Sequence, residues 1–206
     1  MLNQALAIIH DEHRAVGAVL HGLRHVAHAA QSGDKVPDYP LLWAMLSYID
    51  RFSERLHHPK EEHYVFVCLA KRTREGDNVI AALRQQHREG DQWIRDLERT
   101  LGECEGSGSH VMAPFISRLE AFTAEAWKHM ALEESSLLPL AKQFLTAGDW
   151  VEIALAFGRN GDPRFGEEQN REFRDNYRRI VNAAPPPVGL GPLWGSTNNG
   201  MQSGTA

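Results

Sequence analysis

Apolar residues recur every three or four positions along four long stretches of the chain, which is the spacing of amphipathic helices. These stretches cover approximately residues 2–31, 38–72, 78–104 and 111–145. Segments containing glycine, serine or proline separate them, so the connections are short. The pattern therefore predicts an all-α protein with an up-down-up-down antiparallel four-helix bundle.

The sequence after the fourth stretch changes in character twice. Residues 1–146 form the predicted bundle, and residues 147–184 form a helical extension with two short helices at about 149–157 and 167–182. We expect the apolar residues of this extension to cover an end or seam of the bundle, or to make a dimer contact. Proline, glycine, serine and asparagine dominate residues 185–206, so we expect a disordered tail.

Polar residues occupy inner positions of the apolar pattern in each long stretch. His13 stands where the next apolar residue is expected after Ile9, and His87 stands in the same way after Leu83. In the second stretch His58 and Glu62 are four residues apart, and in the fourth His129 and Glu133 repeat that spacing. Residues four apart share one face of a helix, so each pair is able to close on one metal ion.

Pro59 leaves two interpretations of the second stretch open. As an interior residue it kinks the helix, which accounts for a phase change of the apolar pattern after it. As the first residue of a new helix it places Glu61 and Glu62 in an acidic first turn, where they cap the helix instead of binding metal. If the kink rotates the inner face, Glu61 is an alternative ligand to Glu62.

The inner polar residues are predicted to meet at one height of the bundle. In an antiparallel arrangement, a rise of about 1.5 Å per residue puts all six in one layer, roughly 15–24 Å from the same end. They are His13, His58, Glu62, His87, His129 and Glu133. Burying them unpaired costs on the order of a few kcal/mol each, which favours a metal site. A hydrogen-bonded His/Glu network without metal is the alternative.

Composition and charge narrow the partners and the metal. The chain has 206 residues and a formal net charge of -5, which argues against nucleic acid or an anionic membrane as its main partner. The N-terminus does not read as a signal peptide and no apolar stretch is long enough to span a bilayer, so we expect a cytoplasmic protein. Cys68 and Cys104 lack metal-binding spacing and are predicted to be buried thiols. Imidazole and carboxylate without thiolate suit iron, manganese or zinc.

The sequence resembles the hemerythrin-like (HHE cation-binding) family. The resemblance rests on Asp11-Glu12-His13-Arg14, on HHPKEE at 57–62, on His87 and on HMALEE at 129–134. It implies a four-helix bundle holding two non-haem iron ions joined by an oxo or hydroxo bridge. The ligands it implies are His13, His58, Glu62, His87, His129 and Glu133, while Glu61, His10, Tyr64 and Asp91 are left open as contributors.

One departure from the oxygen-carrying hemerythrins bears on function. Their third helix has an HxxxH pair, whereas here the residues four away from His87 are Leu83 and Asp91. The ligand pattern looks closer to bacterial hemerythrin-like proteins and to the di-iron domain of iron-sulfur-centre repair proteins, without the small cysteine-bearing domain of the latter.

The expected function is to bind or sense dioxygen, or to handle peroxide or nitric oxide, in oxidative or nitrosative stress. The partner is then a small diatomic or peroxide ligand, and a homodimer is left open. Two alternatives remain: an enzyme with peroxide or nitric oxide turnover, and an iron-homeostasis or interaction module in which the metal is structural or regulatory.

Overall fold

The computed structural model describes residues 1–32, 37–107, 112–158, 180 and 182, and all regular structure among them is helical. This confirms the predicted all-α class. Two of the long predicted stretches are uninterrupted helices, α1 (Leu2–Ser32) and α5 (Asp77–Gly106). The other two contain π-helical segments, in which each turn holds more residues than an α-helical turn.

The second stretch is a run of five segments without a break. They are α2 (Tyr39–Ile49), the π-helical η1 (Asp50–His57), α3 (His58–Lys60), the π-helical η2 (Glu61–Phe66) and α4 (Val67–Arg72). The fourth stretch contains α6 (Ala113–Leu132), the π-helical η3 (Glu133–Leu137) and α7 (Leu138–Phe144). A further helix, α8 (Ala147–Gly158), follows.

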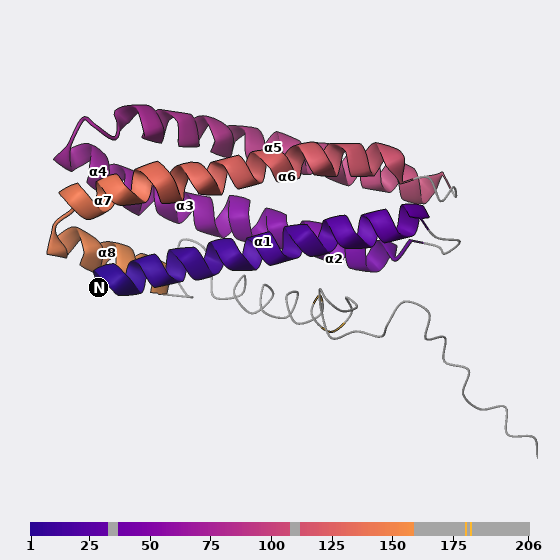
Figure 1. Ribbon diagram of the computed structural model, residues 1–206, viewed down its shortest axis with the longest axis horizontal. Helices are drawn as coiled ribbons and strands as arrows, with labels where there is room; N and C mark the ends of the chain where they lie inside the picture. The colour runs from indigo at the N-terminus through magenta and orange to yellow at the C-terminus, as the bar shows by residue number, and fades with distance from the viewer. Residues whose placement is uncertain (33–36, 108–111, 159–179, 181, 183–206) are drawn as a thin grey trace, which may run out of the picture.

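The long helices lie side by side along the length of the molecule (Figure 1). α1 ends and α2 begins at one end, where α5 ends and α6 begins as well (Figure 1). The ends of α4 and α7 lie at the opposite end, near the N-terminus (Figure 1). The result is a helical bundle whose interior is long enough to contain both apolar and polar layers.

Helix starts are marked by ordinary capping chemistry. The side chain of Asp38 accepts a hydrogen bond of 3.0 Å from the backbone N–H of Leu41, and proline follows in the first turn of α2. At α8 the Asp149 carboxylate accepts hydrogen bonds from the Thr146 backbone N–H and hydroxyl, at 2.8 and 2.7 Å. Arg72 at the end of α4 donates two further bonds of 2.9 Å to Asp149, which ties α4 to α8.

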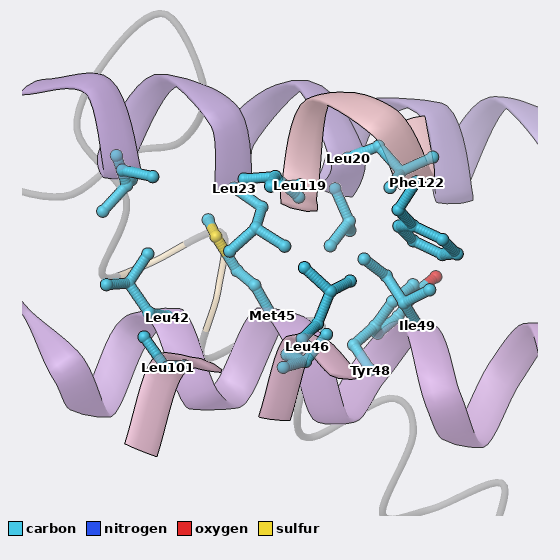
Figure 2. Close-up of a cluster of buried hydrophobic side chains, with 14 of the residues drawn as sticks. Leu20, Leu23, Leu42, Met45, Leu46, Tyr48, Ile49, Leu101, Leu119 and Phe122 are labelled. Atoms are coloured by element: carbon cyan, nitrogen blue, oxygen red, sulfur yellow. The ribbon is translucent and has the colours of Figure 1, made fainter. Parts of the chain in front are cut away.

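Two apolar clusters fill the bundle, and a polar layer separates them. The first cluster packs side chains from α1, α2, α5 and α6 (Figure 2). The second contains the start of α1 with residues from η2, α4, α7 and α8. On α1 the second cluster includes Ile9 and the first includes Val16, so His13 lies between them. The polar layer thus interrupts an otherwise apolar interior.

The C-terminal extension is described in part. α8 buries Trp150, Ile153 and Phe157 in the second apolar cluster, against the start of α1 and η2, so it covers a seam of the bundle. Of the stretch predicted as the second short helix, the structure describes residues 180 and 182; both are helical, and Ile180 joins the first cluster. The predicted disordered tail at 185–206 lies outside the described residues.

Two smaller predictions concern the cysteines and membrane-spanning helices. Cys68 and Cys104 are both buried free thiols, as predicted. Among the described residues, no helix combines the length and apolar character needed to cross a bilayer.

Candidate metal centre

Five imidazoles and two carboxylates from all four long helical stretches meet in the polar layer. Their ligand atoms form two overlapping groups, in each of which the atoms lie within 4.8 Å of one another. The three-histidine group consists of His58, Glu61, His87 and His129. The two-histidine group consists of His13, His57, Glu61 and Glu133. Glu61 belongs to both groups, which therefore lie side by side.

Both carboxylates present one oxygen to each group. Glu61 Oε1 lies 3.2 Å from His57 Nε2, and Glu61 Oε2 lies 3.5 Å from His87 Nε2. Glu133 Oε2 lies 3.0 Å from His13 Nε2, and its Oε1 lies 3.2 Å from His129 Nε2. Each carboxylate therefore lies between the two groups.

An outer ring of side chains contacts the remaining nitrogen of each imidazole. The Nδ1 contacts are His13 with Glu134 at 2.8 Å, His57 with Glu12 at 2.7 Å, His58 with Glu54 at 3.2 Å, His87 with Glu62 at 2.9 Å and His129 with Gln86 at 2.9 Å. Nδ1 of each ring is thus engaged on the outer side, which leaves Nε2 as the nitrogen that would bind a metal in the deprotonated ring.

The buried polar atoms of the layer are placed better for binding a metal than for hydrogen bonding to one another. Glu61 Oε2, both oxygens of Glu133, and Nε2 of His87 and His129 have no hydrogen-bond partner among the described residues. The short N···O separations within the layer therefore bring the atoms close without the directions that hydrogen bonds need. Each unsatisfied buried group costs about 1–3 kcal/mol, and more if it is charged, which bound cations would offset.

The pKa values show which groups carry charge. Burial raises the pKa of a carboxyl, but the neighbouring His129 and His13 outweigh it and hold the pKa of Glu133 well below its usual range. Burial lowers the pKa of His57, yet Glu61 and Glu12 raise it well above its ordinary value. The carboxylates of the layer are thus ionised at neutral pH and ready to bind cations.

The imidazole of His58 behaves in the opposite way. Burial lowers its pKa, and the nearby His87 and His129 rings lower it further, so that it falls well below the ordinary value. A neutral imidazole is the form that binds metal. His58 is therefore in its metal-binding form across the physiological range.

Gly90 provides the space for the carboxyl group beside His58. A Cβ built at Gly90 would overlap the Glu54 carboxylate, so the absence of a side chain there admits Glu54. Burial raises the pKa of Glu54 to about 7, although the surrounding histidines oppose this. Gly90, one turn after His87 on α5, thus has a packing reason, and its neighbour is Glu54.

A small pocket adjoins both groups. It has a volume of about 70 Å³ and is lined by the ligand-type residues His13, His57, His58 and His129 and by Glu54. Its other walls include the apolar side chains Val16, Leu20, Ile49, Phe122 and Met130. Leu20, Ile49 and Phe122 also belong to the apolar cluster of Figure 2. The space suits a few water-sized molecules, since one needs at least about 10–15 Å³.

The structure brings five of the six predicted residues together and places the sixth outside. His13, His58, His87, His129 and Glu133 all belong to the two groups. Glu62 does not, because its carboxylate accepts from His87 Nδ1 on the outer side of that ring. Glu61 holds the inner position instead. In this structure Glu62 therefore contacts the outer nitrogen of His87, and its role as a ligand stays a prediction.

The reason for the difference between Glu61 and Glu62 lies in the helix geometry around Pro59. His57, His58, Lys60 and Glu61 all have helical backbone angles, so the helix continues through the proline and no new helix begins there. The π-helical turns of η1 and η2 on either side change the phase of the inner face. The interpretation of Pro59 as a helix start is wrong, and the π-helical turns explain why Glu61, which a regular 3.6-residue period does not place inside, joins the two groups.

His57 is the residue that sequence reasoning missed. It is adjacent to His58, and on a regular helix two neighbours point about 100° apart, so only one of the two was expected to face inward. Its Nε2 lies 3.2 Å from His13 Nε2. The available signal was the HHPKEE run itself, in which proline favours an irregular turn.

The other candidates from the sequence have different surroundings. Asp91 is exposed, and Tyr64 packs against the second apolar cluster. His10 contacts Glu134 at 3.3 Å, outside the inner layer.

Lys60 is fully buried, with Nζ 3.8 Å from Glu12 Oε1 and 5.4 Å from the centre of the Phe157 ring. Lys60 thus stands behind the two-histidine group.

A helical bundle that buries histidine and glutamate groups of this kind belongs to the class of metal-binding helical proteins. The profile of the Hemerythrin HHE cation binding domain matches residues 4–141, about two-thirds of the chain. The chain therefore belongs to the hemerythrin HHE cation-binding family, as its resemblance predicted. No curated protein and no solved structure gave a match. The family and the His/Glu groups together suggest a metal-binding protein, with iron as its metal.

Proposed function

We propose that this chain is a non-haem di-iron protein that binds or senses dioxygen, or handles peroxide or nitric oxide, in oxidative or nitrosative stress. The observation that carries this proposal is the pair of ligand groups sharing Glu61 beside a small, largely apolar pocket. The pocket is too small for any but a small ligand, which favours a diatomic molecule or peroxide.

The proposed ligand set modifies the one that the sequence predicted. His58, His87 and His129 would hold one ion and His13 and His57 the other, with the Glu61 and Glu133 carboxylates near both. Glu61 replaces Glu62, and His57 is added. Bound iron would supply open coordination positions and electrons for a small oxidant.

We also infer the arrangement that supports this site. The four long helical stretches form an up-down-up-down antiparallel bundle over residues 1–146, and α8 begins the extension that follows it. The positions of the helix ends support this order (Figure 1).

The residues around the pocket control water and protons. Leu20, Ile49 and Phe122 present apolar surface to the pocket, which disfavours filling it with water. The Glu54 carboxyl lines the same pocket, and its pKa of about 7 lets it hold or release a proton near neutral pH. Proton transfer by a positioned carboxyl with a pKa near the working pH is efficient.

Glu54 is also the observation that favours a second candidate, an enzyme with peroxide or nitric oxide turnover. Reduction of either molecule consumes protons, and a proton-holding group at the pocket wall would supply them. Turnover that falls strongly in Glu54→Gln while iron content stays unchanged would distinguish this enzyme from a binding or sensing protein.

The test of the proposed function is anaerobic reconstitution of metal-free protein with Fe(II), followed by exposure to dioxygen, peroxide and nitric oxide in separate samples. We expect about two irons per chain, as in other di-iron bundles, and an optical change with at least one of the three. Trace iron in reconstituted protein would reject the di-iron proposal. Two irons with no response to any of the three would reject the role in gas or oxidant chemistry.

A further inference from the structure

A third group of ligand-type atoms lies on the outer side of His13. His10 Nδ1, His13 Nδ1 and Glu134 Oε1 lie within 4.8 Å of one another. The side chains of His10 and Glu134 are 38% and 44% exposed, whereas His13 is only 6% exposed. The group therefore extends from the protein surface to an imidazole whose other nitrogen faces the inner layer.

A surface hollow opens at the same place. It has a volume of about 400 Å³, and His13 and Glu134 form part of its wall. Gly17, Ala18 and Ala131 leave room in it, and the partly exposed ring of Trp127 packs against Gly17. Arg14 also lines the hollow, and its guanidinium pairs with Asp11. A hydrated ion in this hollow would meet Glu134 before it met any inner carboxylate.

We propose that His10, Glu134 and the outer nitrogen of His13 form an entry site for a divalent cation, which passes the ion to the two-histidine group. The proposal rests on the proposed di-metal function. Two imidazoles and one carboxylate with open positions are a suitable ligand set for Fe(II) and similar ions.

The chemistry of a single imidazole explains why this site is transient. A neutral ring has one N–H, so either Nδ1 or Nε2 has a free lone pair at a given time. An ion on Nδ1 requires the proton on Nε2, whereas an ion on Nε2 requires the proton on Nδ1, where it is donated to Glu134. His13 thus completes the outer site only while its inner nitrogen is unused. The outer site therefore serves entry and does not store a third ion.

Glu62 offers a comparison at a second exposed carboxylate. Its side chain is 35% exposed and it orients His87 as Glu134 orients His13. It belongs to none of the groups of three ligand atoms found among the described residues. Removing Glu62 therefore tests the loss of an orienting carboxylate without the loss of an entry site.

The experiment measures anaerobic Co(II) uptake by the metal-free full chain in a stopped-flow spectrometer, with bound metal counted after equilibration. Cobalt is the probe because it is not oxidised under these conditions. His10→Ala is the decisive variant, because the contact described for His10 is with Glu134 and not with an inner ligand. His25→Ala, an exposed histidine on the same helix, and Glu62→Gln are the controls.

We expect His10→Ala and Glu134→Gln to slow uptake about tenfold, the lower end of what local charge and ligands do to on-rates. The final metal content of His10→Ala stays at the wild-type value, and His25→Ala keeps the wild-type rate. Glu62→Gln slows uptake less than Glu134→Gln.

Three outcomes overturn the entry site: a wild-type rate in His10→Ala, equal slowing in His25→Ala, or a stable third ion in the wild-type protein. Failure of the proposed function looks different. Wild-type protein that holds fewer than two ions, with a rate that still depends on His10, would reject the di-metal site and retain the entry site. No uptake at all would reject both.

Discussion

The two ligand groups share a carboxylate and yet differ in nearly every other respect. The three-histidine group places His58 among other imidazoles, which together with burial hold its pKa low. The two-histidine group places His57 between Glu12 and Glu61, which raise its pKa in spite of burial. The three-histidine group thus contains the neutral imidazole of His58, whereas the two-histidine group holds an imidazole between two carboxylates.

The ionisable residues that border the two groups also differ. Glu54 contacts the three-histidine group at His58, and this carboxyl is close to half protonated at neutral pH. The two-histidine group is bordered by the buried Lys60 and by the exposed His10 and Glu134. We therefore expect two inequivalent ions, one retained by three imidazoles and one that exchanges more readily. The following predictions test this inequivalence, from the largest expected effect to the smallest.

Glu61→Ala should have the largest effect, because it removes the one carboxylate that belongs to both groups. We expect metal content to fall from about two ions per chain to one or fewer. The affinity for metal should fall by about 100-fold or more, because loss of an orienting residue alone typically costs ~10–100-fold. Glu62→Ala is the neighbouring control and should lose no more than that range. Titration with Fe(II) under anaerobic conditions measures both. An equal loss in the two variants would return Glu62 to the ligand set.

His57→Ala should separate the two ions. We expect the three-histidine group to keep about one ion per chain, because its imidazoles and Glu61 remain in place. His63→Ala, at an exposed histidine of the same stretch, should keep both ions. Metal analysis after gel filtration gives the count. Retention of two ions by His57→Ala would show that His57 is not a ligand.

Gly90→Ala should disturb the three-histidine group without touching a ligand. The added methyl group competes with Glu54 for space, and overpacking of this kind typically costs about 1–3 kcal/mol of unfolding free energy. Gly102→Ala lies on the same helix, and its Cβ would meet only Trp43 Cζ2 at 3.9 Å. That variant should instead gain up to about 1 kcal/mol from helix propensity. Urea unfolding of metal-free protein measures the pair, and destabilisation of similar size in both would remove the special role of Gly90.

The metal-free protein should lose stability as pH rises from about 6.5 to 8. Despite burial, neighbouring carboxylates raise the pKa values of His13, His57 and His87, so their stabilisation is complete below the ordinary pKa of 6.5 and is lost through the higher folded value. Glu54, raised to about 7, contributes in the same direction. Each proton released costs on the order of 1 kcal/mol per pH unit.

Thermal unfolding at several pH values checks this slope. His58 does not contribute in this window, because its pKa is lowered and both the folded and the unfolded ring are largely neutral there. Glu54→Gln should flatten the lower part of the curve. A melting temperature that stays level or rises over this range would contradict the assignment of charge to the two-histidine group.

The sequence predicted the helical class and most of the meeting side chains because these depend on a regular period. His13 and His87 lie on uninterrupted helices, and each stands at a position where the helical period expects an apolar residue. This exception to the pattern was enough to identify each of them. Glu61 and His57 lie at π-helical turns next to Pro59, where a regular period assigns faces wrongly. Their identification required the backbone.

The outer ring was also beyond sequence reasoning for a physical reason. His57 meets Glu12 and His129 meets Gln86, and the members of these pairs are 45 and 43 residues apart. Each contact depends on how two helices are rotated against each other. A polar residue on an outer face has no periodic signal that distinguishes it from an ordinary solvated one.

α8 sets the limits of any piece of this protein that would keep its centre intact. The family match ends at residue 141, ahead of α8. Yet the Phe157 ring lies 5.9 Å from the His57 ring and covers Lys60 Nζ. A chain truncated at the family boundary would retain every proposed ligand and still expose a buried lysine and histidine to water. Transplanting the centre into another protein therefore requires residues through Gly158.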